Sequence, residues 1–522
     1  MPSNYRRPGV YLEEAVLRGP GEVGFASAVT LFAGYAAQGP TNVPVRLSSW
    51  SEYTAAFGGF DQPADVQKAF LPYALFSYFQ NGGRNAYVIK AVNGDDGAAA
   101  EVEVGDGDTP TPGVAFTVTA KSDGVWGNTL KVGISYQQSS PLVYTILVYM
   151  TIGSIDVEVE RFNNLSLDGT VPGTKRADAA VNDQIYGSKY IRIEGIDAEI
   201  SPEDTGTSPL SLSGGVNGGV PTSADLSSAV NTALDEITGP VVVNIVGHLD
   251  STGDWVSNSI NPAGLDRGDV FVINDNFDAR PYTQTSAAYG ESIKSSSGSI
   301  TAHSGSSYVA AYTPWIVVPD PAVNGGTITI PPGGAVAGVF ARTDATSGVY
   351  QSPAGVTASV SNALNVDAKF SDALLGDLNS INVNVLRPVA GQGICIMGGR
   401  TRKNFGVDRY INARRTLIYV KETLRNSTQF ALFQNNNEAL WADLYATADR
   451  VLRPIWNSGG LRGTSTNEAY FIVCDETINT PDVIASGEVR MEIGLALEYP
   501  AEFIVIRVSQ FDGGRSTAEI IS

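Results

Sequence analysis

Two segments, LRPVAGQGICIMGGRT at 386–401 and PAEFIVIRV at 500–508, enclose the strongest structural signals of the chain. Between them lie RYINARRTLIYVKETL at 409–424, NNNEALWADLYATADRVLRPIWNSGGLRG at 435–463 and FIVCDETINTP at 471–481. The region holds the longest helical patterns, two of the six tryptophans and a basic run. Its last strand, 503–508, is nearly all apolar, so both of its faces must be covered. The central question is what covers that strand.

Length and composition indicate a folded chain of several domains. Its 522 residues are 43% hydrophobic and 9% aromatic, enough for three or four packed domains. The opening MPSNYRRPGVYLEEAV has no long apolar run, and no membrane-length apolar segment occurs anywhere. Neither a signal peptide nor a membrane span is therefore expected, and we expect synthesis and folding in a cytoplasm.

The net charge of −20 is unevenly distributed. Residues 91–350 carry 30 acidic and 11 basic side chains, whereas both ends of the chain are nearly balanced. An acidic middle is typical of a water-facing region. It argues against nucleic acid or an anionic membrane as its partner, because phosphate contacts need clustered Lys and Arg.

Strand and helix patterns alternate at the beginning and change twice in the middle. Buried strands are expected at 29–36, 43–47 and 87–89, and a helical spacing runs from Val66 to Gly82. Short strand patterns between 100 and 200 predict a small β-sandwich or barrel. After Pro221 the pattern is α/β again, with Ser223 as the expected N-cap of a helix and buried strands at 241–246 and 269–274.

The chain offers little catalytic chemistry. It lacks the common phosphate-loop, dinucleotide, zinc-protease and nucleophile-elbow motifs. His248 and His303 share no metal-ligand spacing, although His248 follows a buried strand. Cys395 and Cys474 lie in apolar contexts and are expected to be buried and reduced. We assign no catalytic residue, cofactor or metal, and we expect no enzyme.

Several blocks follow one another in a specific order along most of the chain. They begin with RRPGVYLEEAV and FAGYAAQGPTNVPVRLSSWSEYTAAFGGF and continue with SDGVWGNTLKV at 122–132. The most specific is PPGGAVAGVFARTDATSGVYQSPAG at 331–355, and the segments of 386–508 complete the series. Together they resemble the tail sheath proteins of contractile phage tails and related injection machines. Pro454, inside the helix pattern 437–456, departs from a regular helix and predicts a kink.

The resemblance implies a multidomain α+β or α/β fold. A conserved α/β core would be built from both chain ends, with β-rich and α/β outer domains inserted between them. The expected divisions are an N-terminal arm (1–20), a first core segment (21–92), an inserted β-sandwich or barrel (93–215), a second inserted α/β domain (216–360), a second core segment (361–500), and a C-terminal strand and arm (501–522).

The resemblance also implies a cover for the last strand. Sheath proteins lend both chain ends to sheets in neighbouring subunits, where main-chain pairing gives affinity and alternate side chains give register. Such head-to-tail contacts propagate as a helical tube. The matching residues are Pro8, Val10, Tyr11, Leu12, Val16, Phe503, Val505 and Arg507.

Eight basic residues between Arg400 and Arg425 stand against only Asp408 and Glu422. One interpretation is a solvated helix face. The other is that some of them touch an acidic surface of a tail tube, as sheath cores do. Exposed ion pairs, worth about 0–1 kcal/mol each, suit a surface that must release. The tube-facing candidates are Arg414, Arg415, Lys421 and Arg425.

The expected function is that of a structural subunit in a contractile tail. Copies would polymerise as stacked hexameric rings into a six-fold helical tube around a tail tube, and contract to drive that tube through a cell envelope. The arms are expected to flex at Gly19 and Gly21 and near Tyr499 and Pro500.

The implied partners are other copies, the tail tube protein, and baseplate and tail terminator proteins, with no nucleic acid and no membrane insertion. The implied location is a virion tail or injection particle assembled in the bacterial cytoplasm. Two alternatives stay open: a baseplate or surface adhesin with a carbohydrate-binding β-domain, and a hydrolase that uses His248.

Overall fold

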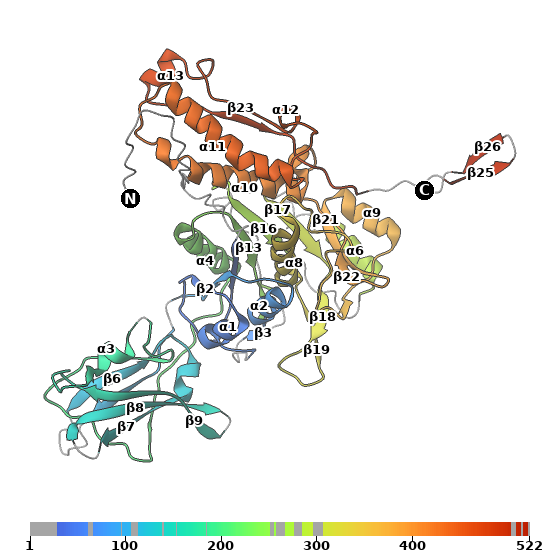
Figure 1. Cartoon of the computed structure of the whole chain (residues 1–522). Helices are drawn as coiled ribbons and strands as arrows, with labels where there is room; N and C mark the ends of the chain where they lie inside the picture. The colour runs from blue at the N-terminus through green and yellow to red at the C-terminus, as the bar shows by residue number, and fades with distance from the viewer. Residues whose placement is uncertain are drawn as a thin grey trace, which may run out of the picture. The chain divides into compact units, whose positions relative to one another are not determined.

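The chain forms two compact units, each with its own helices and strands (Figure 1). The large unit is Ser27–Tyr419 with Leu497–Ser522, and the small unit is Val420–Ala496 with Met1–Ala26. The computed structural model describes residues 29–60, 66–94, 97–105, 113–137, 140–152, 154–183, 185–250, 255–256, 267–275, 284–295, 306–502, 508–512 and 515–519.

An eight-stranded sheet is the main sheet of the large unit (Figure 1). Six neighbouring strands run parallel, and one antiparallel strand lies at each edge. Parallel sheets are buried on both faces, which explains continuous apolar runs such as VVVNI at 241–245. In spatial order the strands are β2 (Val45–Leu47), β4 (Ala86–Lys90), β1 (Val29–Gly34), β13 (Val241–Ile245), β16 (Val270–Asn274), β17 (Val309–Thr313), β21 (Val383–Val389) and β22 (Gly393–Ile396).

Helices pack on both faces of this sheet. Leu31 and Ala33 of β1 belong to a cluster with α4, whereas Phe32 between them belongs to a cluster with α2 and α8. The alternation follows from the two-residue period of a strand. The N-cap of α4 is Thr222, one residue before the expected Ser223. The three helices are α2 (Leu71–Gln80), α4 (Ser223–Glu236) and α8 (Gly333–Ser347).

Close packing of α2 against α8 gives a physical reason for the glycine-rich block at 331–355. A Cβ atom at Gly334 would meet the Ala74 carbonyl oxygen at 2.3 Å, and one at Gly338 would meet the Tyr78 carbonyl oxygen at 2.6 Å. Packed interiors do not tolerate such overlaps, so this approach of the two helices requires glycine at both positions.

The sheet departs from the expected domain plan. Residues 216–360, expected as a second inserted domain, contribute β13, β16 and β17. These three strands are hydrogen-bonded between β1 and β21, so they form the middle of the main sheet. This segment therefore completes the sheet that the earlier and later strands could not close on their own.

The helix expected from Val66 begins later in the structure. Val66–Ala69 forms strand β3, which pairs with β14 (His248–Asp250). The helix α2 starts at Leu71, with Pro72 in its first turn. The other small elements of the large unit are α1 (Trp50–Phe57), β15 (Trp255–Val256), α6 (Ser286–Ser295), β18 (Ile316–Pro319), β19 (Thr327–Ile330), β20 (Asn365–Val366) and α9 (Asp372–Ser380).

Two further sheets share one core between residues 101 and 211. Their spatial orders are β10-β9-β8-β7-β12 and β11-β6-β5, and residues of both sheets, such as Phe116 and Val148, join a single hydrophobic cluster. This agrees with the β-rich pattern at 100–200. The elements are β5 (Glu101–Gly105), β6 (Val114–Ala120), β7 (Leu130–Gln137), β8 (Ser140–Ile152), β9 (Ile155–Ser166), β10 (Lys175–Arg176), α3 (Ala177–Val181), β11 (Ile191–Glu194) and β12 (Leu210–Ser211).

The small unit contains α11 (Glu438–Asn457), which is the longest helix in the described part of the chain. It matches the predicted helix at 437–456 within one residue, and Asn437 caps its N-terminus. Leu440, Trp441 and Leu444 pack on Cys474. The other elements are α10 (Ile411–Ser427), which begins in the large unit, α12 (Thr466–Ala469), β23 (Tyr470–Val473), α13 (Pro481–Ala485) and β24 (Glu492–Leu495).

Candidate assembly surfaces

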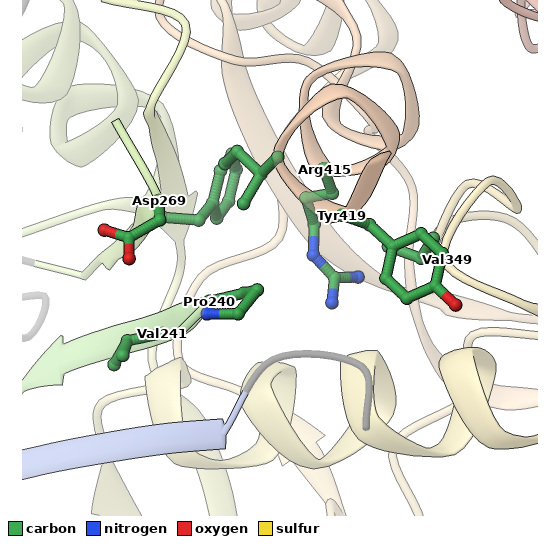
Figure 2. A pocket seen from close by; sticks show the side chains of 8 residues that line it. Pro240, Val241, Asp269, Val349, Arg415 and Tyr419 are labelled. Atoms are coloured by element: carbon green, nitrogen blue, oxygen red, sulfur yellow. The ribbon is translucent and has the colours of Figure 1, made fainter. Parts of the chain in front are cut away.

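Arg415, one of the expected tube-facing residues, is buried inside the large unit. Its side chain is 3% exposed and forms a two-pronged ion pair with Asp344, which is 1% exposed. The guanidinium carbon lies 4.8 Å from the centre of the Phe340 ring. Figure 2 shows Arg415 and Tyr419 projecting from one helix beside a cavity of about 10 Å³, which is room for about one water molecule. Arg415 is therefore wrong as a surface contact.

Arg414 is also engaged within the chain. Its guanidinium pairs with Asp408 and lies 4.4 Å from the centre of the Tyr308 ring, and both members of the ion pair are 15% exposed. Burial acts to raise the pKa of Asp408, but Lys403 and Arg414 outweigh it and hold that pKa below its usual range. Arg414 therefore stabilises the loop before α10 rather than presenting a free charge.

A third internal ion pair holds the chain where the described range 306–502 ends. Arg400 Nε donates to Glu502 Oε1 over 2.8 Å and Nη2 to Oε2 over 2.5 Å, with the two side chains 7% and 18% exposed. Asn412 donates to the Glu498 carbonyl oxygen over 3.2 Å. Contacts thus fix the chain on both sides of Tyr499 and Pro500, where flexing was expected.

Two of the four candidates do lie at the surface. Lys421 and Arg425 are exposed on the last turns of α10. Arg425 is 57% exposed, and its guanidinium forms an ion pair with the buried Glu422 over 2.8 Å. The basic run is therefore neither a uniform solvated face nor a uniform tube contact, since its first half forms buried ion pairs and its last turns reach the surface.

Sequence reasoning missed the acids that hold these arginines. Asp344 is 71 residues from Arg415, and Glu502 is 102 residues from Arg400. Pairs this distant leave no local signal in one sequence. One local signal was available in the run QFALFQ at 429–434. It places three large apolar side chains on the loop between two helical patterns, which is typical of an interaction surface.

The residues expected to exchange strands lie outside the described residues. This holds for the N-terminal set, Pro8, Val10, Tyr11, Leu12 and Val16, and for the C-terminal set, Phe503, Val505 and Arg507. The described chain resumes with β25 (Val508–Asp512), which pairs antiparallel with β26 (Arg515–Glu519). Among the described strands this hairpin has no further neighbour.

The small unit carries a second two-stranded sheet. β23 pairs antiparallel with β24, and neither has another strand neighbour within the described ranges. Phe471 of β23 is 52% exposed, which is unusual for an aromatic residue on a strand. Unpaired strand edges are templates for pairing with another chain.

Three residues considered for catalysis or metal binding, His248, Cys395 and Cys474, are buried inside the fold. His248 lies on β14 and is fully buried, and the centre of its ring lies 6.1 Å from the centre of the Tyr35 ring. Cys395 and Cys474 are buried and not disulfide-bonded. His303 falls outside the described ranges. The described residues contain no group of three side chains placed to hold a metal ion. None of the described helices has the length and apolar content needed to cross a bilayer.

Residues 409–511 match the family described as the phage tail sheath C-terminal domain. This segment includes the whole β23–β24 sheet and most of the first strand of the terminal hairpin. The chain therefore carries the C-terminal domain of a contractile tail sheath protein. The resemblance in the sequence is thereby confirmed, and the family is one of structural sheath proteins of phage tails and injection systems.

Curated sheath relatives match a limited stretch of the chain. The tail sheath protein of Vibrio phage KVP40 is 28% identical over 195 residues, which cover 37% of this chain and 28% of the relative. That of Enterobacteria phage T4 is 28% identical over 162 residues, covering 30% and 24%. The match thus spans about a quarter of the length of these relatives.

Solved sheath structures match nearly the whole chain. The helical sheath of the anti-feeding prophage in its contracted state is 21% identical with a TM-score of 0.57, covering 97% of this chain and 100% of that one. The PVC sheath of an extracellular contractile injection system, also contracted, is 20% identical with a TM-score of 0.52, covering 98% and 100%. The sheath fold therefore extends over both units.

Proposed function

We propose that the chain is a structural subunit that polymerises, as stacked hexameric rings, into a six-fold helical tube around a tail tube. Contraction of the sheath then drives the inner tube through a cell envelope. The match to the sheath C-terminal domain and the fold shared with contracted sheaths support this proposal. The observation that carries it is the pair of two-stranded sheets near the C-terminus, whose edges have no strand partner in the described chain.

These open strands fit pairing between copies. A lone two-stranded hairpin such as β25–β26 is only marginally stable in water. The β23–β24 sheet offers edges of the complementary kind, with main-chain donors and acceptors that another strand could pair. In this proposal, residues 8–16 and 502–508 are the donor segments, and β23–β24 of another copy is the acceptor.

The tube contact is proposed for the exposed end of the basic run. Lys421 and Arg425 reach the surface, whereas the side chains of Arg414 and Arg415 are only 15% and 3% exposed. A few exposed charge pairs with an acidic tube surface give modest, salt-sensitive binding, which suits a sheath that must move along the tube. The baseplate and tail terminator proteins are the proposed partners at the two ends of the sheath.

The proposed mechanism is a spring that needs no nucleotide. The extended sheath is held by a kinetic barrier, and a signal at the baseplate starts its conversion to a shorter and more stable helix. Subunits turn largely as rigid bodies while the arms flex. Because Arg400 holds Glu502, Tyr499 and Pro500 are not part of the proposed flexing of the arms.

Electron microscopy of the purified full-length chain tests this function. The proposal predicts tubes with a six-fold end view. A discrete oligomer that binds carbohydrate and never forms tubes would instead favour the adhesin, and hydrolytic activity lost in His248→Ala would favour the hydrolase.

A charge reversal tests the tube contact separately. Lys421→Glu combined with Arg425→Glu should weaken co-sedimentation with purified tail tubes at low salt, and its difference from the unmodified chain should shrink as salt rises. Arg450→Glu, an exposed residue of α11, is the matched control and should leave binding unchanged. Equal binding of all three proteins would remove these residues from the tube contact.

A further inference from the structure

An apolar knob stands between α10 and α11 in the small unit. It consists of Phe430, Leu432 and Phe433, which are 41%, 64% and fully exposed. Such a group of large apolar side chains on one short loop marks an interaction surface. The segment 429–434 carries no charged residue, so nothing on the loop itself would oppose its burial.

The knob is held in one shape by the chain. The amide of Leu432 donates to the Gln429 carbonyl oxygen, and that of Gln434 to the Ala431 carbonyl oxygen, each over 3.2 Å. Ala431 packs against the hydrophobic cluster that contains Leu440 and Trp441, and this contact anchors the loop to the rest of the unit. Phe433 has φ +62°, a left-handed conformation that bulky residues rarely adopt. The structure thus fixes an aromatic side chain in solvent at a disfavoured backbone angle, which indicates a function.

A hollow of about 460 Å³ opens on the same unit. Trp441, Ala442 and Tyr445 form one wall, from successive turns of α11, and residues 474–477 form the other. Tyr445 is 49% exposed, so aromatic surface is available there. The volume is within the range of sites that hold a group of apolar side chains.

We propose that the knob of one copy docks into the hollow of a second copy. Every copy carries both a knob and a hollow, so the contact can repeat from one copy to the next along an assembly. Phe433 would be its central aromatic anchor, shielded by Phe430 and Leu432 at the rim. The proposal rests on the self-assembly proposed above and adds a contact that does not use the terminal strands.

Charge and position favour a second copy over the tail tube. Glu438, Asp475 and Glu476 line the hollow, which has no basic lining residue among the described ones, so an acidic tube surface would be repelled there. The uncharged knob escapes this repulsion. The hollow also begins at Cys474, the residue that follows β23. Docking there would therefore be continuous with the proposed strand pairing on β23–β24.

Crosslinking between copies tests the contact. Phe433→Cys and Ala442→Cys are made in separate chains that also carry Cys474→Ala, so that the native thiol of the hollow cannot react. The two chains are mixed, assembled, and treated with a short bismaleimide. Crosslinked dimers are expected only in the mixture, and a chain carrying both cysteines should give a ladder of multimers. Phe405→Cys mixed with Ala442→Cys is the matched control, since Phe405 is an 83% exposed phenylalanine outside the knob.

The outcomes separate this contact from the proposed function. Tubes without crosslinks above the Phe405→Cys control, or crosslinks formed only within one chain, would overturn the contact and leave the sheath function standing. A folded full-length chain that never assembles would overturn both. Phe433→Ser should raise the lowest assembling concentration by about tenfold, as loss of a central anchor does, and Phe405→Ser should not. Normal assembly of Phe433→Ser with lost tube binding would assign the knob to the tube and overturn the proposal.

Discussion

The main sheet and the two small sheets near the C-terminus differ in how many strand neighbours their strands have. In the main sheet, six parallel strands each have two neighbours, and helices pack on both faces. In β23–β24 and β25–β26, each strand has one neighbour among the described strands. The six parallel strands thus pair on both sides within the subunit, whereas every strand of the small sheets has one side without a strand partner among the described strands. In the proposed assembly, this difference separates residues that hold the subunit together from residues that join subunits.

The largest expected effect comes from placing one charge in each region. Val243→Asp puts a carboxylate at a fully buried position of β13 and should cost more than about 4 kcal/mol of unfolding free energy. Val505→Asp should change that free energy by only about 0.5 kcal/mol or less while abolishing tubes. Urea unfolding of unassembled protein and electron microscopy measure the two effects. If Val505→Asp unfolds the subunit as Val243→Asp does, the strand belongs to the subunit's own core.

Two arginines of α10 sharpen the same contrast. Arg415→Ala leaves Asp344 charged and unpaired in the interior, so we expect a loss of about 3–5 kcal/mol in unfolding free energy. Arg425→Ala removes the 57% exposed arginine that pairs with the 1% exposed Glu422, and it should cost less, about 1–3 kcal/mol, because water reaches the arginine side of this pair. Denaturant unfolding of both variants provides the comparison. Equal losses would contradict the assignment of Arg415 to the interior.

A smaller effect concerns pH and the buried carboxyl of Asp275, after the end of β16. Burial raises its pKa to about 6, although the Gly333 amide and the Asn244 side chain donate hydrogen bonds to it. In an unfolded chain an aspartic acid has a pKa of about 3.9, so between about pH 6 and pH 4 the folded state binds more protons than the unfolded one. Asp275 should therefore add stability as pH falls through this window and lose that contribution as pH rises through the same window.

The change attributable to Asp275 is on the order of 2–3 kcal/mol. Asp275→Asn should remove it from the pH dependence of urea unfolding, whereas Asp443→Asn, at an exposed position of α11, should retain it. An unaltered pH dependence in Asp275→Asn would show that this carboxyl does not titrate in that window.

Local periodicity explains how much of the fold could be predicted from sequence. The apolar face of α11 and its cap Asn437 lie within one stretch of chain, and the helix appeared within one residue of its predicted bounds. Val66–Ala69 became a strand because it pairs with β14, about 180 residues later, which helical spacing cannot reveal. The place of β13, β16 and β17 in the main sheet depends on pairing of the same long-range kind.

The candidate surfaces likewise depend partly on local sequence and partly on contacts between distant residues. Arg415 and Arg425 belong to one basic pattern, and only the distant Asp344 decides that the first is buried. Family blocks identified the sheath fold without any of these contacts, because they record residue order along the chain rather than partners. The proposed tube contact and strand exchange involve other molecules, whose surfaces the sequence of one chain does not specify.

Removal of residues 1–16 tests the central claim most directly, that chain ends join the subunits. The truncated and full-length chains are compared by circular dichroism and urea unfolding for folding, and by electron microscopy for assembly. We expect a folded subunit with unchanged unfolding free energy that forms no tubes. Normal sheaths assembled from the truncated chain would contradict it.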